Sequence, residues 1–164
     1  MIKTGIGYDA HQLKKGMPLI IGGILIESPM GSVGHSDGDG LIHAICDSLL
    51  GASSLGDIGK LFPSDDEKWE NVESRLFLNE VNRMVSEAGY HIANIDCTII
   101  LQKPKLSNYI EDIKKNIANI LNTNQNIISI KATTTDYLGY IGESKGWSVI
   151  ALSTIYSADG KNSY

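Results

Sequence analysis

The stretch GHSDGDGLIHAICDSLLGASSL, residues 34–55, joins a loop rich in glycine and aspartate to a segment with helical periodicity. Its second half carries apolar side chains at positions 41, 42, 45, 49 and 50, which is the spacing of one face of a helix. Asp37 or Asp39 is a candidate N-cap, because a short carboxylate can accept hydrogen bonds from unpaired helix amides. The loop before the helix is compatible with a metal site, a phosphate-binding loop or an ordinary turn.

Segments with strand character stand on both sides of this helix. A β-hairpin is predicted over 18–27, because Gly22 and Gly23 separate two β-rich runs. A helix over 107–121 alternates isoleucines with lysines and asparagines, and Ser107 is its expected N-cap. The other predicted elements are strands over 2–8, 92–102, 126–135 and 147–156 and a helix over 71–88. This order predicts an α/β (α+β) fold with a small mixed β-sheet and helices packed on one face, as a single domain over 1–156 followed by a polar tail over 157–164.

Length, charge and hydropathy narrow the function classes. The chain of 164 residues has a formal net charge of −5 and no basic run, which argues against nucleic acid as a partner. No apolar run approaches the roughly 20 residues of a membrane span, and residues 1–11 have the pattern of neither a signal nor a transit peptide. We therefore expect a cytoplasmic protein, or one of an organellar stroma if a transit peptide was removed, with Cys46 and Cys97 reduced and buried.

Asp9, His11 and His43 form the first candidate site. Residues two apart on a strand point to the same face, so Asp9 and His11 would project together if 2–11 is a strand. His43, in the first turns of the helix, would complete a three-ligand set that leaves the open position required by catalytic zinc. Asp47, one turn further, could accept the second ring N–H of His43. The competing interpretation is a capped strand end and a core histidine satisfied by hydrogen bonds.

Four further segments carry polar groups suited to an anionic ligand. In the glycine-rich loop, His35 and Ser36 could donate hydrogen bonds to phosphate oxygens. The other three segments are GDIGKLFPSDD (56–66) with Asp57 and Gly59, LQKPKLS (101–107) with Lys103 and Lys105, and KATTTD (131–136), whose hydroxyls suit phosphate and whose aspartate suits magnesium. Each segment taken alone also fits an ordinary turn, a solvated acidic loop or a threonine-rich strand end.

Taken together, these motifs resemble the 2-C-methyl-D-erythritol 2,4-cyclodiphosphate synthase family. The resemblance covers residues 2–156 and rests on GYDAH (7–11), HSDGDGLIH (35–43), GDIGKLFP (56–63), the Pro104-Lys105 pair and KATTTDYLGYIG (131–142). It implies a phosphorus–oxygen lyase of the non-mevalonate route to isoprenoids, which converts 4-diphosphocytidyl-2-C-methyl-D-erythritol 2-phosphate to the 2,4-cyclodiphosphate and CMP. It also implies a homotrimer with its sheets around the threefold axis and its active sites between subunits.

The resemblance further implies roles for individual residues. Those implied in metal binding are Asp9, His11 and His43 for one Zn²⁺ per subunit, and Asp136 for a Mg²⁺ or Mn²⁺ that accompanies the substrate diphosphate. Those implied in stabilising the transition state are His35 and Thr134. Those implied in substrate binding are Asp9, His11, His35, Ser36, Asp57, Gly59, Phe62, Asp66, Pro104, Lys105, Leu106, Thr133, Thr134, Thr135, Asp136 and Tyr140.

The chain departs from the family pattern at three positions. Asp136 stands where the family commonly has glutamate, and the shorter carboxylate can still hold a divalent ion. In GESKG (142–146), Glu143 stands where many members have arginine, and Lys145 where they have glutamate. In relatives that arginine faces a cavity on the trimer axis that accepts isoprenoid diphosphates, and three Glu143 carboxylates would repel such anions. We therefore expect this protein to lack that anion site.

Two alternative functions stay open at this point. A mononuclear iron oxygenase also uses two histidines and a carboxylate, but it leaves KATTTD and the lysine-bearing segment 101–107 without a role. A non-catalytic trimeric nucleotide-binding protein with a structural metal would need a fourth protein ligand, because structural zinc sites are normally closed. No such ligand is apparent in the sequence.

Overall fold

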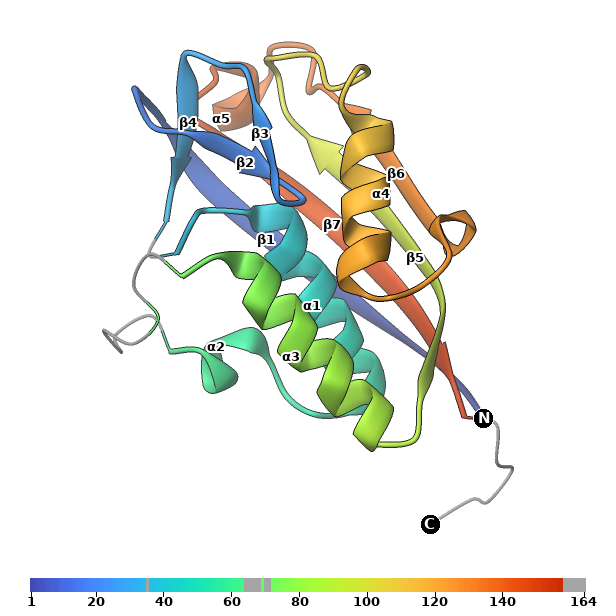
Figure 1. Cartoon of the computed structure of the whole chain (residues 1–164). Coiled ribbons are helices and arrows are strands. Elements are labelled where there is room, and N and C mark those ends of the chain that lie inside the picture. Colours follow the sequence, from blue (N-terminus) through green and yellow to red (C-terminus); the bar gives the residue numbers. More distant parts are fainter. Residues whose placement is uncertain (35, 64–68, 70–71, 158–164) are drawn as a thin grey trace.

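A five-stranded mixed β-sheet forms one layer of the molecule, and the helices lie on one side of it (Figure 1). The computed structural model describes residues 1–34, 36–63, 69 and 72–157. The strands, in spatial order, are β4 (Met30–Val33), β1 (Ile2–Lys15), β7 (Gly146–Tyr156), β5 (His91–Ile100) and β6 (Ile128–Thr133). Only the β5–β6 pair of this sheet is parallel. A separate two-stranded hairpin consists of β2 (Leu19–Ile21) and β3 (Ile24–Ile26).

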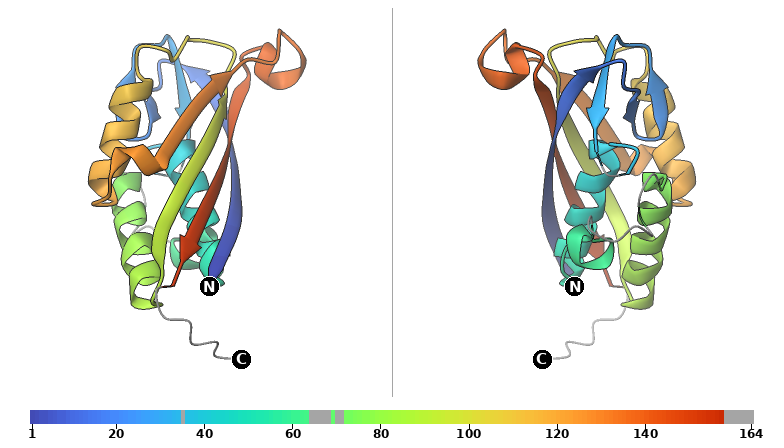
Figure 2. Two further views of the ribbon diagram at one scale, coloured as in Figure 1. Left: turned by 90° about the vertical axis from the view of Figure 1, so that its right-hand side faces the viewer. Right: turned by 90° about the vertical axis from the view of Figure 1, so that its left-hand side faces the viewer.

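Three long helices cover one face of this sheet (Figure 2). They are α1 (Gly40–Ser53), α3 (Ser74–Glu87) and α4 (Ile110–Ile120). The short elements are α2 (Ile58–Leu61), the 3₁₀ turn Gln125–Ile127 and α5 (Gly139–Gly142). The expected α/β architecture, with a mixed sheet and helices on one face, is therefore confirmed. Among the described residues, no helix is long and apolar enough to cross a membrane.

Glycines in β1 bring helix α1 unusually close to the sheet. A Cβ atom on Gly5 would lie 2.1 Å from the carbonyl oxygen of Ser48, and one on Gly7 would lie 2.0 Å from that of Ala44. Both distances are far below van der Waals contact, so the backbones of α1 and β1 can meet only where side chains are absent. The side chains that follow these glycines on the same face of β1 are therefore held beside α1.

The hydrophobic core lies between the helices and the sheet. On β7 the side chains of Trp147, Val149 and Ala151 are fully buried against the helices, and Ile45 and Leu49 of α1 are buried opposite them. Even-numbered residues of β1 face the other way and are exposed. This alternation is the period of two expected for a strand with one covered face. Cys46 and Cys97 are buried and unbonded to each other, as expected.

Several element boundaries differ from the sequence predictions. The first strand extends to Lys15, because its residues 12–15 pair with β4, a short strand that was not predicted. The predicted cap of the fourth helix is wrong: α4 begins at Ile110, and residues 107–109 form a turn instead. The hairpin at Gly22 and Gly23 is confirmed, since both glycines adopt positive φ angles of 61° and 75°. The predicted tail, from residue 158 onward, lies outside the described residues.

Candidate metal centre and its cavities

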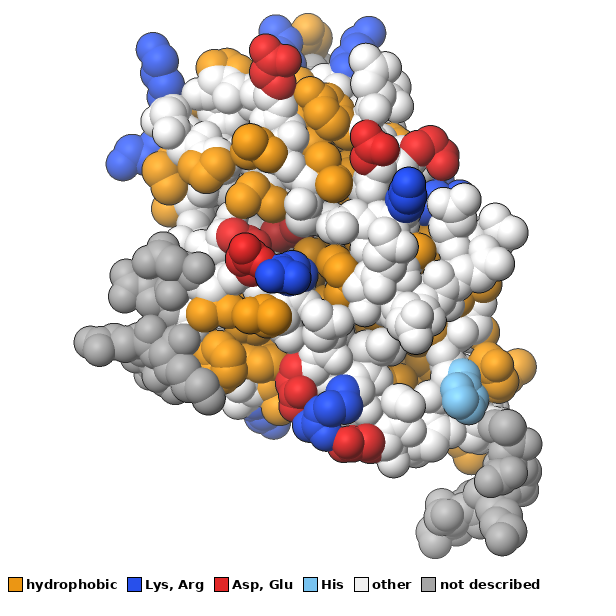
Figure 3. Space-filling view, viewed as in Figure 1, with side chains coloured by type: hydrophobic (Ala, Val, Ile, Leu, Met, Phe, Trp, Pro, Cys, Tyr) orange, Lys and Arg blue, Asp and Glu red, His pale blue; other side chains and the backbone are white. Residues whose placement is uncertain are grey.

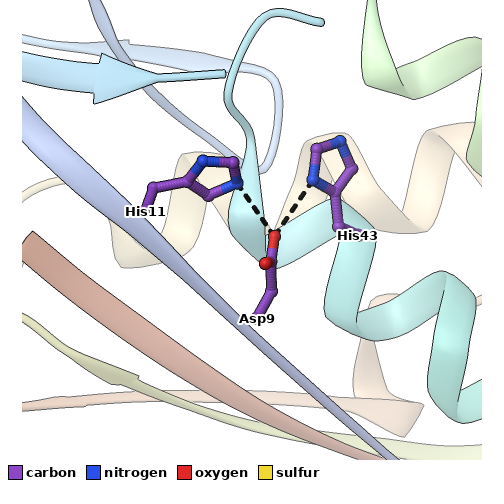
Figure 4. Close-up of side chains that lie close together, drawn as sticks. All are labelled: Asp9, His11 and His43. Carbon is purple, nitrogen blue, oxygen red and sulfur yellow. Dashed lines mark hydrogen bonds and ion pairs between the residues drawn. The ribbon is translucent and has the colours of Figure 1, made fainter. Parts of the chain in front are cut away.

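Asp9, His11 and His43 converge on one point at the end of the β1–α1 contact (Figure 4). The Asp9 Oδ2 atom lies 2.9 Å from His11 Nε2 and 3.0 Å from His43 Nδ1. One ligand atom from each residue falls within 4.8 Å of the other two. Asp9 and His11 share a face of β1, as their spacing predicts, and His43 lies in the first turn of α1.

The local backbone explains why these side chains can approach. The amide of Ala10 donates to Asp9 Oδ1 at 2.8 Å, which leaves Oδ2 turned toward the two imidazoles. Gly40 opens the helix beside them, because a Cβ there would lie 3.0 Å from the His11 ring and 3.3 Å from Asp9 Oδ2. The His11 ring also stacks on Trp147, whose indole N–H donates to Ser32. The cluster is thus held by the fold on several sides.

Each imidazole is anchored through its other nitrogen. His11 Nδ1 lies 3.0 Å from the carbonyl oxygen of Val33, which can only accept, so this nitrogen carries the proton. His43 Nε2 lies 2.8 Å from Ser74 Oγ and 3.2 Å from Ser36 Oγ. The predicted hydrogen bond from His43 to Asp47 is wrong. The Asp47 carboxylate instead accepts from the Ile58 amide at 2.8 Å and holds the start of α2.

Electrostatics inside the cluster favour a charged pair when no metal is bound. Burial alone would raise the pKa of Asp9, but hydrogen bonds from His11 and His43 outweigh it and hold that pKa well below its usual range. Burial lowers the pKa of His11, but the adjacent Asp9 carboxylate reverses this and raises it overall. One carboxylate and two imidazoles, with outer-shell partners and an open side, are a donor set that fits a divalent transition metal.

Both aspartates of the glycine-rich loop accept hydrogen bonds from backbone amides. Asp39 is fully buried, and its carboxylate accepts from the amide of Ile42 at 3.1 Å, which confirms it as the N-cap of α1. The same carboxylate accepts from the amides of Gly22 and Gly23 and so ties the hairpin to the helix. Burial raises the pKa of Asp39 to about 6 despite these three amide bonds. Asp37 accepts from the amide of Ser74 at 2.9 Å and from its hydroxyl.

The Asp9–His11–His43 cluster lies in the wall of a cavity of about 560 Å³. Its lining residues are Asp9, His11, Ser36, His43, Asp47, Ile58, Gly59, Phe62, Pro63 and Phe77. Besides Asp9 and His11 themselves, three of the predicted substrate contacts line this cavity: Ser36, Gly59 and Phe62. Asp57, a fourth, caps α2 by accepting from the amide of Lys60 at 2.9 Å. His35 and Asp66 lie outside the described residues.

The other predicted contacts line different cavities. Pro104, Lys105, Leu106, Thr133 and Thr134 border a cavity of about 350 Å³ at the carboxyl end of β6. An adjoining cavity of about 680 Å³ shares three of these residues, Pro104, Lys105 and Thr134, and adds Asp136. Neither cavity shares a lining residue with the one at the metal cluster. Within one chain, the structure thus separates the predicted site residues into two groups.

Three predicted positions near the second group have other surroundings. The Thr135 hydroxyl donates to the carbonyl oxygen of Leu138 at 2.7 Å. The Tyr140 hydroxyl lies 3.4 Å from that of Tyr8, on the uncovered side of the sheet. Glu143 forms an ion pair with Lys145 at 2.5 Å, with both side chains more than half exposed.

Sequence reasoning missed two residues that shape the site. Phe77 of α3 stacks on Phe62 with ring centroids 4.4 Å apart and packs beside His43. Ser74, at the start of the same helix, is fully buried against His43. Both lie more than thirty positions from the ligands along the chain, and only the packing of α3 on α1 brings them there.

Comparison with known proteins shows relatives along almost the whole chain. A protein of Clostridium acetobutylicum named 2-C-methyl-D-erythritol 2,4-cyclodiphosphate synthase is 52% identical over 147 residues, covering 90% of this chain and 95% of that protein. A protein of the same name from Clostridium botulinum (strain Hall) is 49% identical over 151 residues, covering 92% and 97%.

Solved structures agree with these relatives. The structure described as a CDP complex of Plasmodium falciparum IspF is 37% identical and superposes with a TM-score of 0.85, covering 96% of this chain and 97% of that one. The bifunctional IspDF of Campylobacter jejuni is 39% identical with a TM-score of 0.93, covering 97% of this chain. Of that longer bifunctional chain, 43% is matched. The sequence profile of the YgbB family matches residues 2–156, and the chain therefore belongs to the YgbB family.

Proposed function

We propose that this protein is a 2-C-methyl-D-erythritol 2,4-cyclodiphosphate synthase. It would convert 4-diphosphocytidyl-2-C-methyl-D-erythritol 2-phosphate to the cyclic diphosphate and CMP, in the cytoplasm, as a phosphorus–oxygen lyase of the non-mevalonate isoprenoid route. The observation that carries the proposal is the Asp9–His11–His43 cluster in the wall of a cavity, in a member of a family whose named relatives catalyse this step. Those names give no support to the iron oxygenase alternative.

The reaction requires cations and a fixed orientation of the reacting groups, because the 2-phosphate and the diphosphate of the substrate are both anionic. The substrate 2-phosphate oxygen attacks the β-phosphorus, and CMP leaves. We assign Zn²⁺ to Asp9, His11 and His43, where it would polarise a phosphate oxygen in its open position. Ser36, Gly59 and Phe62 line the same cavity and are placed to hold the methylerythritol part.

The second group of residues suits the cytidine diphosphate part. Lys105 brings positive charge to the cavity at the end of β6, and Leu106 gives it a buried apolar wall. We assign hydrogen bonding of the developing phosphate charge to Thr134 and to His35. Asp136 would bind Mg²⁺ or Mn²⁺ with the substrate diphosphate, because magnesium typically combines one or two carboxylates with phosphate oxygens.

A homotrimer would unite the two groups of residues. The face of the sheet that carries no helix exposes Ile6 and Tyr8 of β1, which pair with the exposed Leu152 and Ile150 of β7. Two adjacent apolar cross-strand pairs in water favour burial by another subunit. The helix-covered face differs, since charged side chains of both signs are interspersed over it (Figure 3). We therefore place subunit contacts at the uncovered face, with each active site built from two neighbouring chains.

The decisive experiment is a turnover assay with the cytidine diphosphate substrate. We expect release of CMP together with the cyclic diphosphate, and loss of both products after treatment with a chelator and recovery on adding Zn²⁺. Tight binding of CMP without turnover would instead support a nucleotide-binding protein with a structural metal. Oxygen consumption dependent on iron would support an oxygenase.

The oligomeric state is tested by light scattering with a matched pair of variants. Ile6 and Leu25 are each 67% exposed in the single chain, but Ile6 lies on the uncovered sheet face and Leu25 on the hairpin. We expect the parent and Leu25→Asp to have the mass of three chains and Ile6→Asp to dissociate. A monomeric parent protein would contradict the shared active site.

A further inference from the structure

A partly buried hydrogen-bond chain runs from the Asp9–His11–His43 cluster to the loop before α1. His43 Nε2 contacts the hydroxyl of Ser74 at 2.8 Å, and this hydroxyl in turn contacts the Asp37 carboxylate. Ser74 is fully buried, and its amide also reaches Asp37, at 2.9 Å. The chain therefore links three elements, α1, the start of α3 and the glycine-rich loop, at the side of His43 that faces away from Asp9.

Counting protons determines the direction of this chain. A carboxylate without a proton can only accept, so Asp37 accepts from both the amide and the hydroxyl of Ser74. The single hydroxyl proton of Ser74 is then committed to Asp37, and its oxygen must accept from His43. His43 Nε2 therefore carries a proton, with Ser36 Oγ at 3.2 Å as a second contact. The lone pair of Nδ1 is left facing Asp9 Oδ2, 3.0 Å away.

A lone pair directed at a carboxylate oxygen is stable only with a cation or a proton between them. The same situation holds at His11, where the Val33 carbonyl takes the Nδ1 proton and leaves Nε2 facing the same Asp9 oxygen. The two imidazoles are thus set in opposite tautomers so that both lone pairs point to one place. At His11 a backbone carbonyl does this, whereas at His43 two side chains do it.

We propose that Ser74 and Asp37 are positioning residues that hold His43 in its Nε2–H tautomer and direct Nδ1 to a divalent metal. The proposal rests on the proposed function only in assuming a metal at Asp9, His11 and His43. Such outer partners fix the ring orientation of ligating histidines, and their loss typically costs about 10–100-fold in metal affinity. Asp37, a candidate N-cap of α1 in the sequence, would instead act on His43 through two successive hydrogen bonds.

Two substitutions perturb the chain in different ways. Ser74→Ala removes the acceptor for Nε2–H. Asp37→Asn keeps the shape of the side chain, but its N–H₂ must replace one of the two oxygens. Oδ2 accepts from the backbone amide of Ser74 at 2.9 Å, whereas Oδ1 accepts from the hydroxyl of Ser74 and from the amide of Asp39 at 3.2 Å. The N–H₂ takes the Oδ1 position, because the amide contact there is the longer one and the hydroxyl can turn away, so the N–H₂ would donate to the hydroxyl oxygen. The hydroxyl proton would then point at His43 Nε2 and favour the wrong tautomer.

Ser53→Ala is the matched control. Ser53 is a buried serine of α1, the helix that carries His43, but its hydroxyl donates only to carbonyl oxygens of its own helix, those of Leu49 and Leu50. Competition titrations with a chromophoric chelator would measure the affinity of each protein for Zn²⁺ and Co²⁺. We expect affinity to fall about 10–100-fold for Ser74→Ala and Asp37→Asn, and to stay within twofold of the parent for Ser53→Ala.

Long-range ¹H–¹⁵N spectra of the histidines supply a readout that general loss of stability would not change. We expect Nε2–H at His43 in the parent and in Ser53→Ala, and Nδ1–H in metal-free Asp37→Asn. The proposal would be overturned by a zinc affinity equal to that of the parent in both Ser74→Ala and Asp37→Asn, or by an unchanged His43 tautomer in Asp37→Asn. If Ser74→Ala does not fold, the affinity and spectrum of Asp37→Asn decide the outcome.

These measurements are independent of turnover. Weakened metal binding in a protein that does not cyclise the substrate would support the positioning role and reject the proposed function. Unchanged metal binding by Ser74→Ala and Asp37→Asn, in a protein that does cyclise the substrate, would reject the positioning role and support the proposed function.

Discussion

The Asp9–His11–His43 cluster and the carboxyl end of β6 differ in how many of their side chains are buried and held by partners within a single chain. At the cluster, the side chains of Asp9, His11 and His43 are only 25%, 12% and 16% exposed, and each has fixed partners. At the end of β6, Thr133, Thr134 and Asp136 are exposed. Thr134 and Asp136 contact each other at 3.3 Å, in a segment where Asp136 and Tyr137 adopt positive φ angles of 49° and 66°.

This contrast shows where the protein is organised before any ligand arrives. To bind a metal ion, the cluster would need no further rearrangement, because helix and strand already hold its candidate donors in place. The hydroxyls of Thr133 and Thr134 contact only neighbouring residues of the same segment, so they would need a facing surface to act on the proposed substrate. Positive φ at two residues other than glycine is an uncommon conformation that the surrounding structure must stabilise. The first region is therefore tested by metal binding and the second by turnover.

The largest effect is expected from removing a metal ligand. His11→Ala should reduce zinc affinity by more than the roughly 10–100-fold typical of outer-shell changes, and should abolish turnover. The remaining ligands cannot compensate, since Asp9 would keep one imidazole partner instead of two. Metal content after dialysis and CMP release measure this. If substitutions of Asp9, His11 and His43 all left metal content unchanged, the ligand assignment would be wrong.

Thr134→Ala should separate the two regions. Removing one hydrogen-bond donor to developing phosphate charge typically lowers turnover by about 10²–10³-fold. Zinc content should stay that of the parent, because Thr134 lines the cavity at the end of β6 and not the one at the cluster. Steady-state kinetics and metal analysis on the same preparation check both. A variant that lost its zinc would show that the two regions are coupled within the chain.

The close contact of α1 with β1 is tested by two glycine substitutions with opposite expected signs. Gly7→Ala places a methyl group against the backbone of Ala44 and should reduce the free energy of unfolding by about 1–3 kcal/mol or more. Gly51→Ala is the control, because its Cβ would meet its nearest atom at 4.0 Å, and alanine in a helix is favoured by about 0.5–1 kcal/mol. Denaturant titrations of both variants measure the difference, and zinc affinity should fall only in Gly7→Ala.

The pH dependence of stability should reverse when zinc is bound. In the unfolded chain, Asp and His titrate near about 3.9 and 6.5. The lowered pKa of Asp9 gives stability present above about pH 4 that is lost as the pH falls, and the raised pKa of His11 gives stability present below about pH 6.5 that is lost as the pH rises. Metal-free protein should thus be destabilised above the raised pKa of His11.

Zinc-loaded protein should show the opposite trend over the same range. Zinc competes with the protons on the ligands, so the increase in Tm on adding Zn²⁺ should grow between about pH 5.5 and pH 8. Thermal unfolding with chelator and with Zn²⁺ gives both curves. A zinc-induced shift independent of pH would argue that His11 is not a ligand.

The smallest effect concerns the Glu143–Lys145 ion pair. Because both side chains are largely exposed, their interaction with an added anion is weak. We expect farnesyl diphosphate to leave the Tm of this protein nearly unchanged, and the double change Glu143→Arg, Lys145→Glu to produce a small increase. Stabilisation of the parent equal to that of an arginine-bearing relative would contradict the expected loss of the anion site.

Much of the secondary structure follows from local rules. The helix that begins at Gly40 was predictable because apolar residues recur with helical spacing after a capping aspartate, and Asp39 provides the cap. Asp9 and His11 share a face because the period of a strand is two. The strand β4 was not predictable, since the residues MGSV carry no strong strand pattern and acquire it only by pairing with β1.

The partners of the site could not be read from spacing. Asp47 lies one helical turn from His43, yet its carboxylate accepts from the amide of Ile58, which as the first amide of α2 has no acceptor within that helix. Ser74 takes the place predicted for Asp47 at His43, although it is 31 positions away in sequence. Sequence spacing predicts which residues share a face of one element, but it does not predict which side chain from another element will satisfy a buried donor.

By itself, the sequence determined most of the helical and strand segments, the candidate trio Asp9, His11 and His43, and the family to which its motifs point. Only the tertiary structure decided the distances between these three side chains and which other residues orient them. The reason is that these depend on the close passage of α1 over Gly5 and Gly7 and on the docking of α3. Both are long-range contacts, set by which surfaces fit when the core closes, and no local pattern encodes them.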